Sequence, residues 1–538
     1  MPITRVRAVF LCICVAVVMG LLGCAGAPSW PQEPIKIIGP ADNPASVLWA
    51  PAGEKTRYRQ DLRDGVKRVL RFDLDGDGQF ERLTDLDQLD PKEIQHVFIF
   101  LDGVPYKLFA ELYDEGHFRL FHRPARFIGP FPTLTDVSFN NIFGVSGMSC
   151  YESIIFNRTT NEVHNGTGLY LAGHNELWAS RLDYRQALWM DGVSYMLPGW
   201  ASRREFNRMF ARASQTLQDK LDQQNVLIYS ISTDALCHME SWQRAREMMI
   251  ELDRYIEQLM FEREGRLGVI MMTDHGNNFA GECRKAPIDE ALDATRLTII
   301  RDRGFRRAGE VLVPRYGLIS LVRAYCQNTC DRDAVVGALS HCEGVEQVMW
   351  RDGDTVHVIA PAISPGAARI CHRAGAEPGR EFFSYQIDGG DPLKLGALLA
   401  GLKIYRFEGD DADWYDAAEL LTATADHDWP DPLWRTWHGL NDQTAVAPDV
   451  AASLAVGWYY GAPGLDAFAP LRGTHGGLSK ADSVTFFVST MFAPPPIMRT
   501  TDVIPVVNEH FPWTPPTADP ATHGLEKYLA VPAAGSSQ

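Results

Sequence analysis

Acidic and histidine side chains recur in four short polar fragments of the sequence. Three fragments follow an apolar run and the fourth precedes one. The side chains are Asp102, Asp234, His238, Asp274, His275 and His475. Carboxylate and imidazole groups are good ligands for Zn²⁺ and related divalent ions. Six of them suffice for two metal ions with three protein ligands each, and two metals about 4 Å apart can stabilise the attacking and leaving oxygens of a phosphoryl displacement.

The apolar runs beside these fragments predict the strands that position them. Residues 96–101, 226–231, 267–272 and 483–489 are short, apolar and rich in β-branched or aromatic side chains. Apolar residues at helical spacing over 242–260 precede the third run. This alternation predicts an α/β fold with a doubly wound, mostly parallel sheet and helices on both faces. Ligands of such sheets gather beyond the carboxyl ends of the strands, where the first three fragments fall.

A hydroxyl-rich segment lies between the first and second fragments. Residues 129–138 contain Thr133, Thr135 and Ser138. A hydroxyl beside a metal can lose its proton and attack phosphorus. The backbone N–H groups at a helix start would also favour an anionic phosphate. The alternative interpretation of each residue is a helix N-cap, and one residue can fill both roles.

Together the fragments resemble the alkaline phosphatase superfamily, and most closely its branch of nucleotide pyrophosphatases and phosphodiesterases. The matching motifs occur in the family's order. They are Leu101-Asp102-Gly103, Pro132-Thr-Leu-Thr135, Asp234-x-x-x-His238, Asp274-His275-Gly276 and His475-Gly476. The resemblance implies a doubly wound α/β core, two zinc ions, and hydrolysis of phosphate mono- or diesters through a phosphothreonine on Thr135.

The resemblance also implies how the ligands divide between the metals. One metal would take Asp102, Thr135, Asp274 and His275, and the other would take Asp234, His238 and His475. The chain departs from the diesterase branch after the nucleophile, where Asp136-Val137-Ser138 replaces the usual Phe-Pro-Asn. Ser138 is therefore the candidate donor to a substrate oxygen. The formylglycine motif of sulfatases is not found.

Three interpretations of these residues stay open. The first is a metal-dependent phosphohydrolase, and the second is a phosphotransferase or phosphonate hydrolase of the same superfamily. The third is a non-catalytic surface lipoprotein that uses the fold for binding. Six intact ligands together with Thr135 favour an enzyme.

Residues 73–84 begin like a calcium loop. Positions 1, 3 and 5 are Asp73, Asp75 and Asp77, and a glycine stands at position 6. Position 12 is Thr84 instead of the expected glutamate, so Asp85 or Asp87 would have to substitute. The alternative is an acidic Asp-Gly turn. A calcium ion here would have a structural role.

The first residues resemble an export signal. Arg5 and Arg7 precede an apolar run over 8–22, which is shorter than the about 20 residues that span a bilayer. The run ends in Leu-Leu-Gly-Cys24, which resembles a bacterial lipobox with Cys24 as the lipidated residue. The alternative is an ordinary signal peptide with a chance cysteine. We expect a lipoprotein anchored to a bacterial cell membrane, in the periplasm or at the cell surface.

Composition divides the chain into five segments. They are a signal peptide over 1–23, a tether over 24–60, a calcium-loop segment over 61–90, a catalytic domain over 91–511 with a cap insertion at about 300–440, and a loose tail over 512–538. An exported location permits disulfides, and the cysteine cluster over 326–371 predicts one or two.

The net charge limits which classes of binding partner we expect. The chain has 51 Lys+Arg against 68 Asp+Glu, a formal net charge of −17. Phosphate backbones need a basic surface, so we expect no nucleic-acid partner. The expected partners are a small phosphorylated substrate and, through Cys24, a membrane.

Overall fold

The computed structural model describes residues 36–38, 46–49, 55–63, 67–145, 154–165, 178–185, 199–315, 317–444, 446–461 and 471–515. The predicted signal peptide, Cys24 and most of the predicted tail lie outside these ranges. Within them, none of the helices combines the length and the apolar character that crossing a membrane requires.

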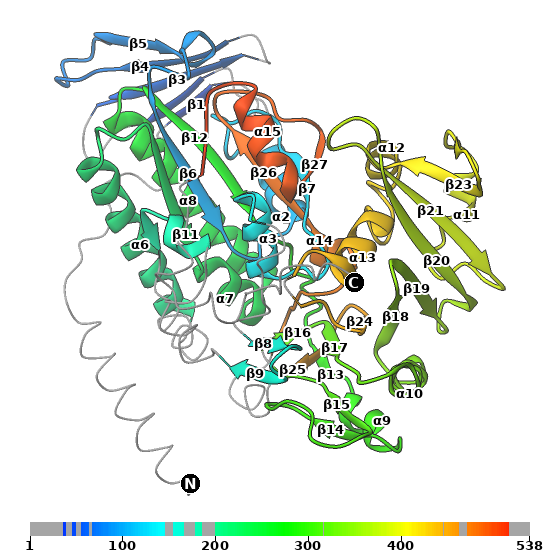
Figure 1. Ribbon diagram of the computed structural model, residues 1–538. Helices are drawn as coiled ribbons and strands as arrows, with labels where there is room; N and C mark the ends of the chain where they lie inside the picture. Colours follow the sequence, from blue (N-terminus) through cyan, green and yellow to red (C-terminus); the bar gives the residue numbers. More distant parts are fainter. Residues whose placement is uncertain are drawn as a thin grey trace, which may run out of the picture.

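A central sheet occupies the middle of the molecule (Figure 1). In the described chain it has seven strands, in the order β10-β11-β6-β12-β26-β7-β27. They are β6 (Gln95–Leu101), β7 (Ala125–Ile128), β10 (Tyr184–Arg185), β11 (Asn225–Ser230), β12 (Leu267–Thr273), β26 (Val484–Ser489) and β27 (Ile497–Arg499). The four strands expected from sequence are among them, and β10, β11, β6 and β12 run parallel.

Strand β26 differs from a simple parallel sheet, because it runs antiparallel to both β12 and β7. Its first residue therefore lies at the edge of the sheet where β6, β11 and β12 end. This reversal explains how a fragment that precedes a strand joins fragments that follow strands.

Helices cover both faces of the sheet, which confirms the doubly wound α/β class. Val97, Ile99 and Leu101 pack in one core with the helices of the first face. These are α2 (Tyr106–Asp114), α6 (Gly199–Asp219), α7 (Ser232–Met239) and α8 (Trp242–Glu262). Phe98 and Phe100 point to the opposite core. That core includes α3 (Thr135–Ile142), η2 (Trp178–Arg181) and α15 (Val503–Asn508).

An antiparallel sheet precedes the central sheet in the chain and packs against α8. Its strands, in spatial order, are β1 (Lys36–Ile38), β2 (Ser46–Trp49), β3 (Tyr58–Arg63), β4 (Lys67–Phe72) and β5 (Arg82–Asp85). The tether prediction for 24–60 is therefore wrong over β1, β2 and the first residues of β3. Buried Trp49, Tyr58, Leu70 and Phe72 join the core of the first face. Segments that contain Pro and Gly separate these strands, so the alternation of apolar and polar residues along each strand is hard to recognise in the sequence.

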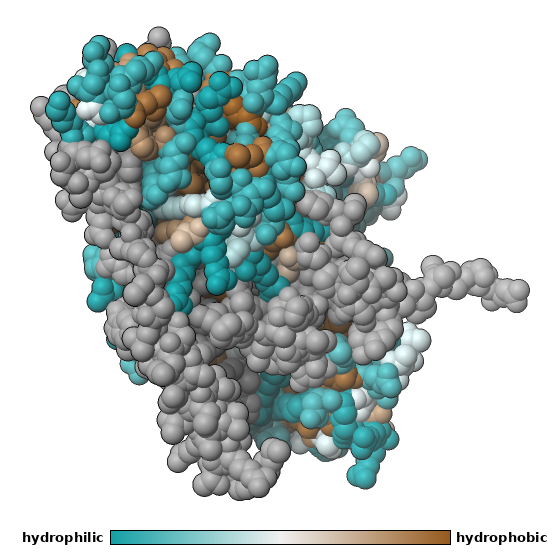
Figure 2. All heavy atoms as spheres, turned by 90° about the vertical axis from the view of Figure 1, so that its left-hand side faces the viewer, coloured by the Kyte–Doolittle hydropathy of each residue, from teal (hydrophilic) through white to brown (hydrophobic). Residues whose placement is uncertain are grey.

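Where atoms are coloured in Figure 2, the side of the molecule that carries this sheet is mostly hydrophilic. Apolar residues among the coloured atoms of that face lie in small separate groups. Scattered apolar exposure of this kind is ordinary for a globular surface.

A second large sheet forms the cap. It is antiparallel, with eight described strands in the order β17-β24-β18-β19-β20-β21-β23-β22. They are β17 (Leu321–Ala324), β18 (Val345–Asp352), β19 (Thr355–Ala360), β20 (Ser364–Ala374), β21 (Glu381–Asp388), β22 (Tyr405–Phe407), β23 (Asp410–Asp416) and β24 (Val450–Leu454). The insertion predicted at about 300–440 thus extends further, because β24 returns between β17 and β18.

Helices pack on both faces of the cap sheet. One face carries α11 (Gly396–Leu399), α12 (Ala417–Ala423) and α13 (Pro432–Asn441), and the other carries α9 (Ile288–Asp293) and α10 (Thr329–Ser340). Smaller elements complete the described chain. They are β8 (Ile154–Asn157), β9 (Glu162–Asn165), β13 (Arg284–Lys285), β14 (Thr298–Ile300), β15 (Glu310–Leu312), β16 (Leu318–Ile319), β25 (Trp458–Gly461), α14 (Lys480–Ser483), η1 (Leu86–Gln88) and η3 (Thr500–Asp502).

The cysteine cluster does not form the expected disulfides. All six described cysteines are free, including the four at Cys326, Cys330, Cys342 and Cys371. Cys326 and Cys342 are buried in the core beneath α10. There they pack as small apolar side chains, a common role for an unpaired cysteine.

Candidate metal centre

The register of the central sheet brings three predicted ligands to one edge. Leu101 of β6 pairs with Ser230 of β11 and with Thr273 of β12. Asp102 and Asp274 directly follow their strands, and Asp234 lies in the first turn of α7. The loop before α14 brings His475 to the same edge. The six side chains predicted as metal ligands therefore gather in one place, although their assignment as ligands stays a prediction.

All three histidines of this group are oriented by backbone carbonyl groups. The Nδ1 atom lies 2.8 Å from Gly473 O in His238, 2.9 Å from Gly276 O in His275 and 2.8 Å from Thr133 O in His475. A carbonyl only accepts, so each Nδ1 must carry the proton. Each Nε2 therefore faces the carboxylates. A neutral ring offers a lone pair there to a metal, as in metal sites whose second nitrogen is held by a backbone group, and a protonated ring donates a hydrogen bond to a carboxylate.

The first half of the group surrounds His275. Its Nε2 lies 3.4 Å from Asp102 Oδ1 and 3.4 Å from Asp274 Oδ2. Thr135 Oγ1 is 3.4 Å from the same nitrogen. These four side chains are the set that the resemblance assigns to one metal.

The second half of the group surrounds Asp234. Its Oδ1 lies 3.1 Å from His238 Nε2 and 3.8 Å from His475 Nε2. The rings of His275 and His475 stack with centroids 3.7 Å apart, so the two halves adjoin. His275 can offer a ligand atom to either half.

Burial makes this concentration of negative charge costly without cations. The exposed fraction is 1% for Asp102, 0% for Asp274 and 8% for Asp234. Burial raises the pKa of the Asp274 carboxyl. It would do the same for Asp234, but the charge and hydrogen bond of His238 hold the pKa of that carboxyl well below its usual range. Converging carboxylates and imidazole lone pairs form a donor set that fits divalent metal ions.

Thr135 stands where a nucleophile would be needed. It is the first residue of α3, where helix N–H groups lack partners within the helix. It is partly exposed, whereas Thr133 and Ser138 are fully buried. Of the three hydroxyls considered from sequence, Thr135 is the one that meets the Asp–His group and remains accessible.

The other polar residues of this segment, Thr133, Asp136 and Ser138, are buried beside the group. Thr133 Oγ1 accepts the Gly476 N–H at 2.8 Å and so holds the His475 loop. Asp136 accepts the Trp178 indole N–H at 3.2 Å. Ser138 in α3 is 0% exposed, and its contact with substrate stays a prediction. The side-chain direction along a helix start decides these roles, and spacing alone does not reveal it.

Several residues that support the group are not evident from the sequence. The Tyr229 hydroxyl donates to Asp102 Oδ2, and Thr233 Oγ1 accepts the Asp102 N–H at 2.9 Å. Gly103 has a φ of +69°, and a Cβ there would lie 2.7 Å from Asp234 Oδ1. Only glycine combines this conformation with such a close approach.

Asp482 joins two of the loops that carry candidate ligands. It accepts the Gly477 N–H at 3.0 Å and an amide N–H of Asn278 at 3.2 Å. Burial raises the pKa of Asp482 to about 7. The sequence places this residue in a polar turn before β26 but offers no signal for the bridge.

The predicted calcium loop also brings acidic groups together. Ligand atoms of Asp73, Asp75, Asp77 and Glu81 lie within 4.8 Å of one another. Glu81 therefore takes the place expected for Asp85 or Asp87, because Asp85 caps η1 and Asp87 pairs with Arg68 at 2.6 Å. Asp73 accepts the N–H groups of Gly76 and Gly78, as in an Asp-Gly turn. Calcium binding stays a prediction.

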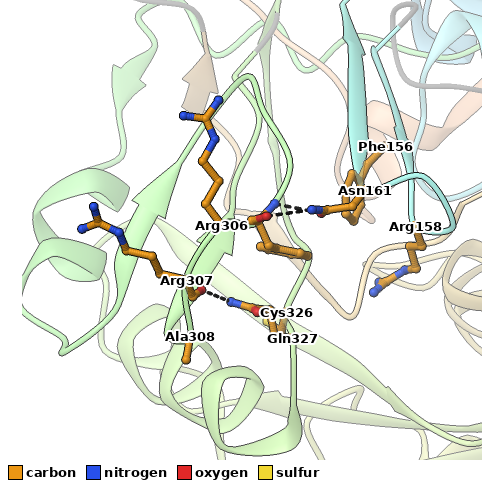
Figure 3. Close-up of a pocket in the computed structure, with 9 residues that line it drawn as sticks. Phe156, Arg158, Asn161, Arg306, Arg307, Ala308, Cys326 and Gln327 are labelled. Carbon is orange, nitrogen blue, oxygen red and sulfur yellow. Dashed lines mark hydrogen bonds between the residues drawn. The ribbon is translucent and has the colours of Figure 1, made fainter.

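A separate surface cavity of about 520 Å³ lies between the β8–β9 hairpin and the segment around β15 (Figure 3). Its lining includes Phe156, Arg158, Arg306 and Gln327. The arginine side chains at 306 and 307 extend away from the hairpin in Figure 3. None of the six candidate metal ligands lines this cavity.

Comparison with known proteins gives only distant likenesses. No known family profile and no curated protein sequence matches the chain. Among solved structures, human ectonucleotide pyrophosphatase/phosphodiesterase 5 is 12% identical, with 77% of this chain and 94% of that chain covered and a TM-score of 0.38. Phosphonoacetate hydrolase from Sinorhizobium meliloti 1021, in complex with phosphonoformate, has the same identity and coverage and a TM-score of 0.40.

The murine ectonucleotide pyrophosphatase/phosphodiesterase 5, in an inactive form in complex with AMP, is similar at 12% identity and a TM-score of 0.38. The match covers 79% of this chain and 97% of that chain. Likenesses this distant leave the function of the chain to be argued from its own residues.

Proposed function

We propose that the protein is a divalent-metal-dependent phosphohydrolase that cleaves phosphate mono- or diesters through Thr135. One observation carries the proposal. Three imidazole Nε2 atoms, three buried carboxylates and one accessible helix-start hydroxyl meet at the ligand-binding edge of an α/β sheet. Zinc is the metal that this mixture of nitrogen and oxygen donors favours.

The residues divide the chemistry as follows. Bound divalent ions would supply electrostatic stabilisation and make a hydroxyl or water more acidic. The Thr135 hydroxyl loses its proton and its Oγ–P bond forms while the bond from phosphorus to the leaving oxygen breaks. That oxygen takes up one proton, so the proton count of the step balances. Backbone N–H groups at the start of α3 would favour the negative charge of the phosphoryl oxygens. Water then cleaves the phosphothreonine, which restores Thr135 and releases the phosphate product.

The test combines metal content with turnover. Zinc per chain is measured, and p-nitrophenyl phosphate and bis-p-nitrophenyl phosphate are assayed with and without a chelator. We expect chelator-sensitive release, and the faster ester assigns the mono- or diester preference. Thr135→Ala should lower turnover on the order of 10³-fold or more with unchanged zinc content.

Thr422→Ala is the matched control, because Thr422 is an exposed helical threonine whose hydroxyl bonds only to Ala418 O at 3.1 Å among the described contacts. It should turn over like the wild type. Bound zinc without release from either ester would favour the non-catalytic binding protein. Retained turnover in Thr135→Ala would remove this residue as the nucleophile.

We also propose that Cys24 carries a lipid that anchors the enzyme to a bacterial membrane. The support is the order of the basic residues, the apolar run and the lipobox in the sequence. Cys24→Ser should move the protein from the membrane fraction to the soluble exported fraction. An unchanged distribution would argue for an ordinary signal peptide.

A further inference from the structure

A second histidine–carboxylate cluster lies in the cap. His372 belongs to β20, Glu381 opens β21 and His438 belongs to α13. His372 pairs with Phe383 across the two strands, so the side chain of Glu381, two residues earlier, lies on the same face of the sheet. Helix α13 covers this face. Three elements thus bring one potential ligand each to the same point.

The three ligand atoms already stand close to the spacing of a metal site. Glu381 Oε1 lies 3.0 Å from His372 Nε2 and 3.2 Å from His438 Nε2. Bonds of about 2.0–2.2 Å in a tetrahedral site place neighbouring ligand atoms about 3.3 Å apart. One carboxylate oxygen facing two ring nitrogens therefore needs little movement to share an ion with them.

The hydrogen bonds around the cluster fix which atoms face inward. His438 Nδ1 lies 2.7 Å from Asp442 Oδ1, so this nitrogen carries a proton. The Trp434 indole N–H donates to Glu381 Oε2 at 2.8 Å, which turns Oε1 toward the histidines. In protein metal sites, a ligating histidine commonly donates its other N–H to a carboxylate, and a ligating carboxylate accepts a further hydrogen bond.

In a neutral His438, no hydrogen lies between the ring Nε2 and Glu381 Oε1. With Nδ1 protonated, the Nε2 of a neutral His438 carries a lone pair that faces the lone pairs of Glu381 Oε1. His438 is only 8% exposed, so water relieves little of the repulsion. Either a second proton on the ring or a cation between the three atoms must stabilise this arrangement.

We propose that His372, Glu381 and His438 bind a divalent transition-metal ion of the zinc class, separate from the metal centre at the sheet edge. Two imidazoles and one carboxylate suit zinc and its neighbours rather than calcium or magnesium, which prefer oxygen ligands. The side chains of His372 and Glu381 are 16% and 25% exposed, so a further coordination position can reach solvent.

The ion would fasten α13 to the cap sheet. This helix also carries Arg435, whose guanidinium donates to Leu478 O at 2.9 Å and to Gly477 O at 3.4 Å. These carbonyls belong to the loop that follows His475. The cap ion would therefore stabilise the helix that supports one side of the metal centre, without contact with substrate.

The experiment counts metal in the full chain and in matched variants. The variants are His372→Gln, His438→Gln and His357→Gln, where His357 lies on β19 of the same sheet with its ring stacked on Trp350 at 5.1 Å. We expect the first two to hold about one zinc fewer per chain than the wild type, and His357→Gln to hold the wild-type number. Equal zinc content in all four proteins would overturn the proposal.

A local optical signal tests the site when a variant is unstable. The rings of His372 and Trp437 have centroids 4.2 Å apart, and those of His438 and Trp434 are 4.4 Å apart. Added Co²⁺ should quench tryptophan fluorescence in the wild type and in His357→Gln, and more weakly in His372→Gln. Identical quenching in all of them would show a protonated network without metal.

The outcome is independent of the proposed phosphohydrolase activity. Asp274→Asn alters the sheet-edge centre alone and should leave the cap ion in place. A chain that holds only the cap ion and releases nothing from phosphate esters would contradict the proposed function while supporting the cap site.

Discussion

Tyr229 in β11 and Gly103, which follows the neighbouring strand β6, each affect the position of one candidate carboxylate ligand. The hydroxyl of Tyr229 donates to Asp102, and the absence of a side chain at Gly103 leaves room for Asp234. Neither residue would touch a bound metal. Their effect on the centre is therefore separable from that of the ligands.

Tyr229→Phe should weaken metal binding without unfolding the protein. The change removes one hydrogen bond to a ligand carboxylate, and losses of this kind lower metal affinity about 10–100-fold. Zinc competition titration measures the effect. The control is Tyr255→Phe, which removes a hydroxyl that bonds to Ser214 at 3.1 Å, and it should keep wild-type affinity. Equal affinities in both variants would contradict a role for Tyr229.

Gly103→Ala should lower zinc content and turnover, because the new Cβ would lie 2.7 Å from Asp234 Oδ1. Gly353→Ala separates this clash from backbone strain, since Gly353 has a φ of +60° and a Cβ added there would meet nothing within 4 Å. Both variants should lose about 1 kcal/mol of unfolding free energy from the positive φ. Only Gly103→Ala should lose metal, as measured by zinc content after dialysis.

The candidate ligands can be predicted from sequence because Asp and His at strand ends form a recognisable pattern. The groups that orient these ligands cannot be predicted from sequence. The partners of His238, His275 and His475 are backbone carbonyls, which any residue could provide. The contact of Ser138 with substrate stays a prediction. Its spacing from Thr135 suits a shared site, and its side chain is buried in the structure.

At the scale of elements, the four apolar runs are predictable because each is continuously apolar and buried, and the α8 stripe is predictable because its apolar residues recur at helical spacing. The direction of β26 is not predictable, since an isolated strand carries no sequence mark of its orientation. The strands from β1 to β5 escape prediction in part because charged and polar residues interrupt their apolar side chains, as in β3 and β4. Their apolar side chains gain burial only when α8 covers them.

The contact between β3 and α8 contains a buried acid. Glu257 is 2% exposed and accepts from Gln60. Burial, reinforced by the charge of Asp253, raises the pKa of Glu257 well above its usual value. The folded state thus retains a proton that the unfolded chain releases above about pH 4.5.

The contribution of Glu257 to the stability of the folded state should therefore fall as pH rises above about 4.5 toward its raised pKa. One retained proton gives a slope of at most about 1.4 kcal/mol per pH unit. Glu257→Gln should flatten this part of the curve and be more stable than the wild type at pH 8, but not at pH 4. Urea unfolding at a series of pH values measures the difference, and parallel curves for the two proteins would contradict the assignment.

At the scale of the whole molecule, one buried ion pair joins the cap to the central sheet. Arg499 at the end of β27 binds Asp431, the residue before α13, through two contacts of 2.6 and 3.0 Å. Asp431 is 1% exposed. Removing the arginine would leave a buried carboxylate without its main partner.

Arg499→Met should cost about 3–5 kcal/mol of unfolding free energy. Arg244→Met is the control, because the Arg244–Glu247 pair is on the surface, with side chains 55% and 41% exposed, and should cost about 0–1 kcal/mol. Denaturant unfolding followed by tryptophan fluorescence measures both. A cost below about 1 kcal/mol for Arg499→Met would mean that the cap is held by apolar packing alone.

The position of His475 near the end of the chain governs when the centre can form during synthesis. Asp102 emerges early, but His475 follows the whole cap, and Phe511 and Trp513 must still stack on His96 and Phe98 of β6. Contacts this distant in sequence form late and slowly. A chain truncated before His475 therefore lacks one of the six candidate ligands, and the group at the sheet edge is incomplete until the segment around His475 has folded against the strands.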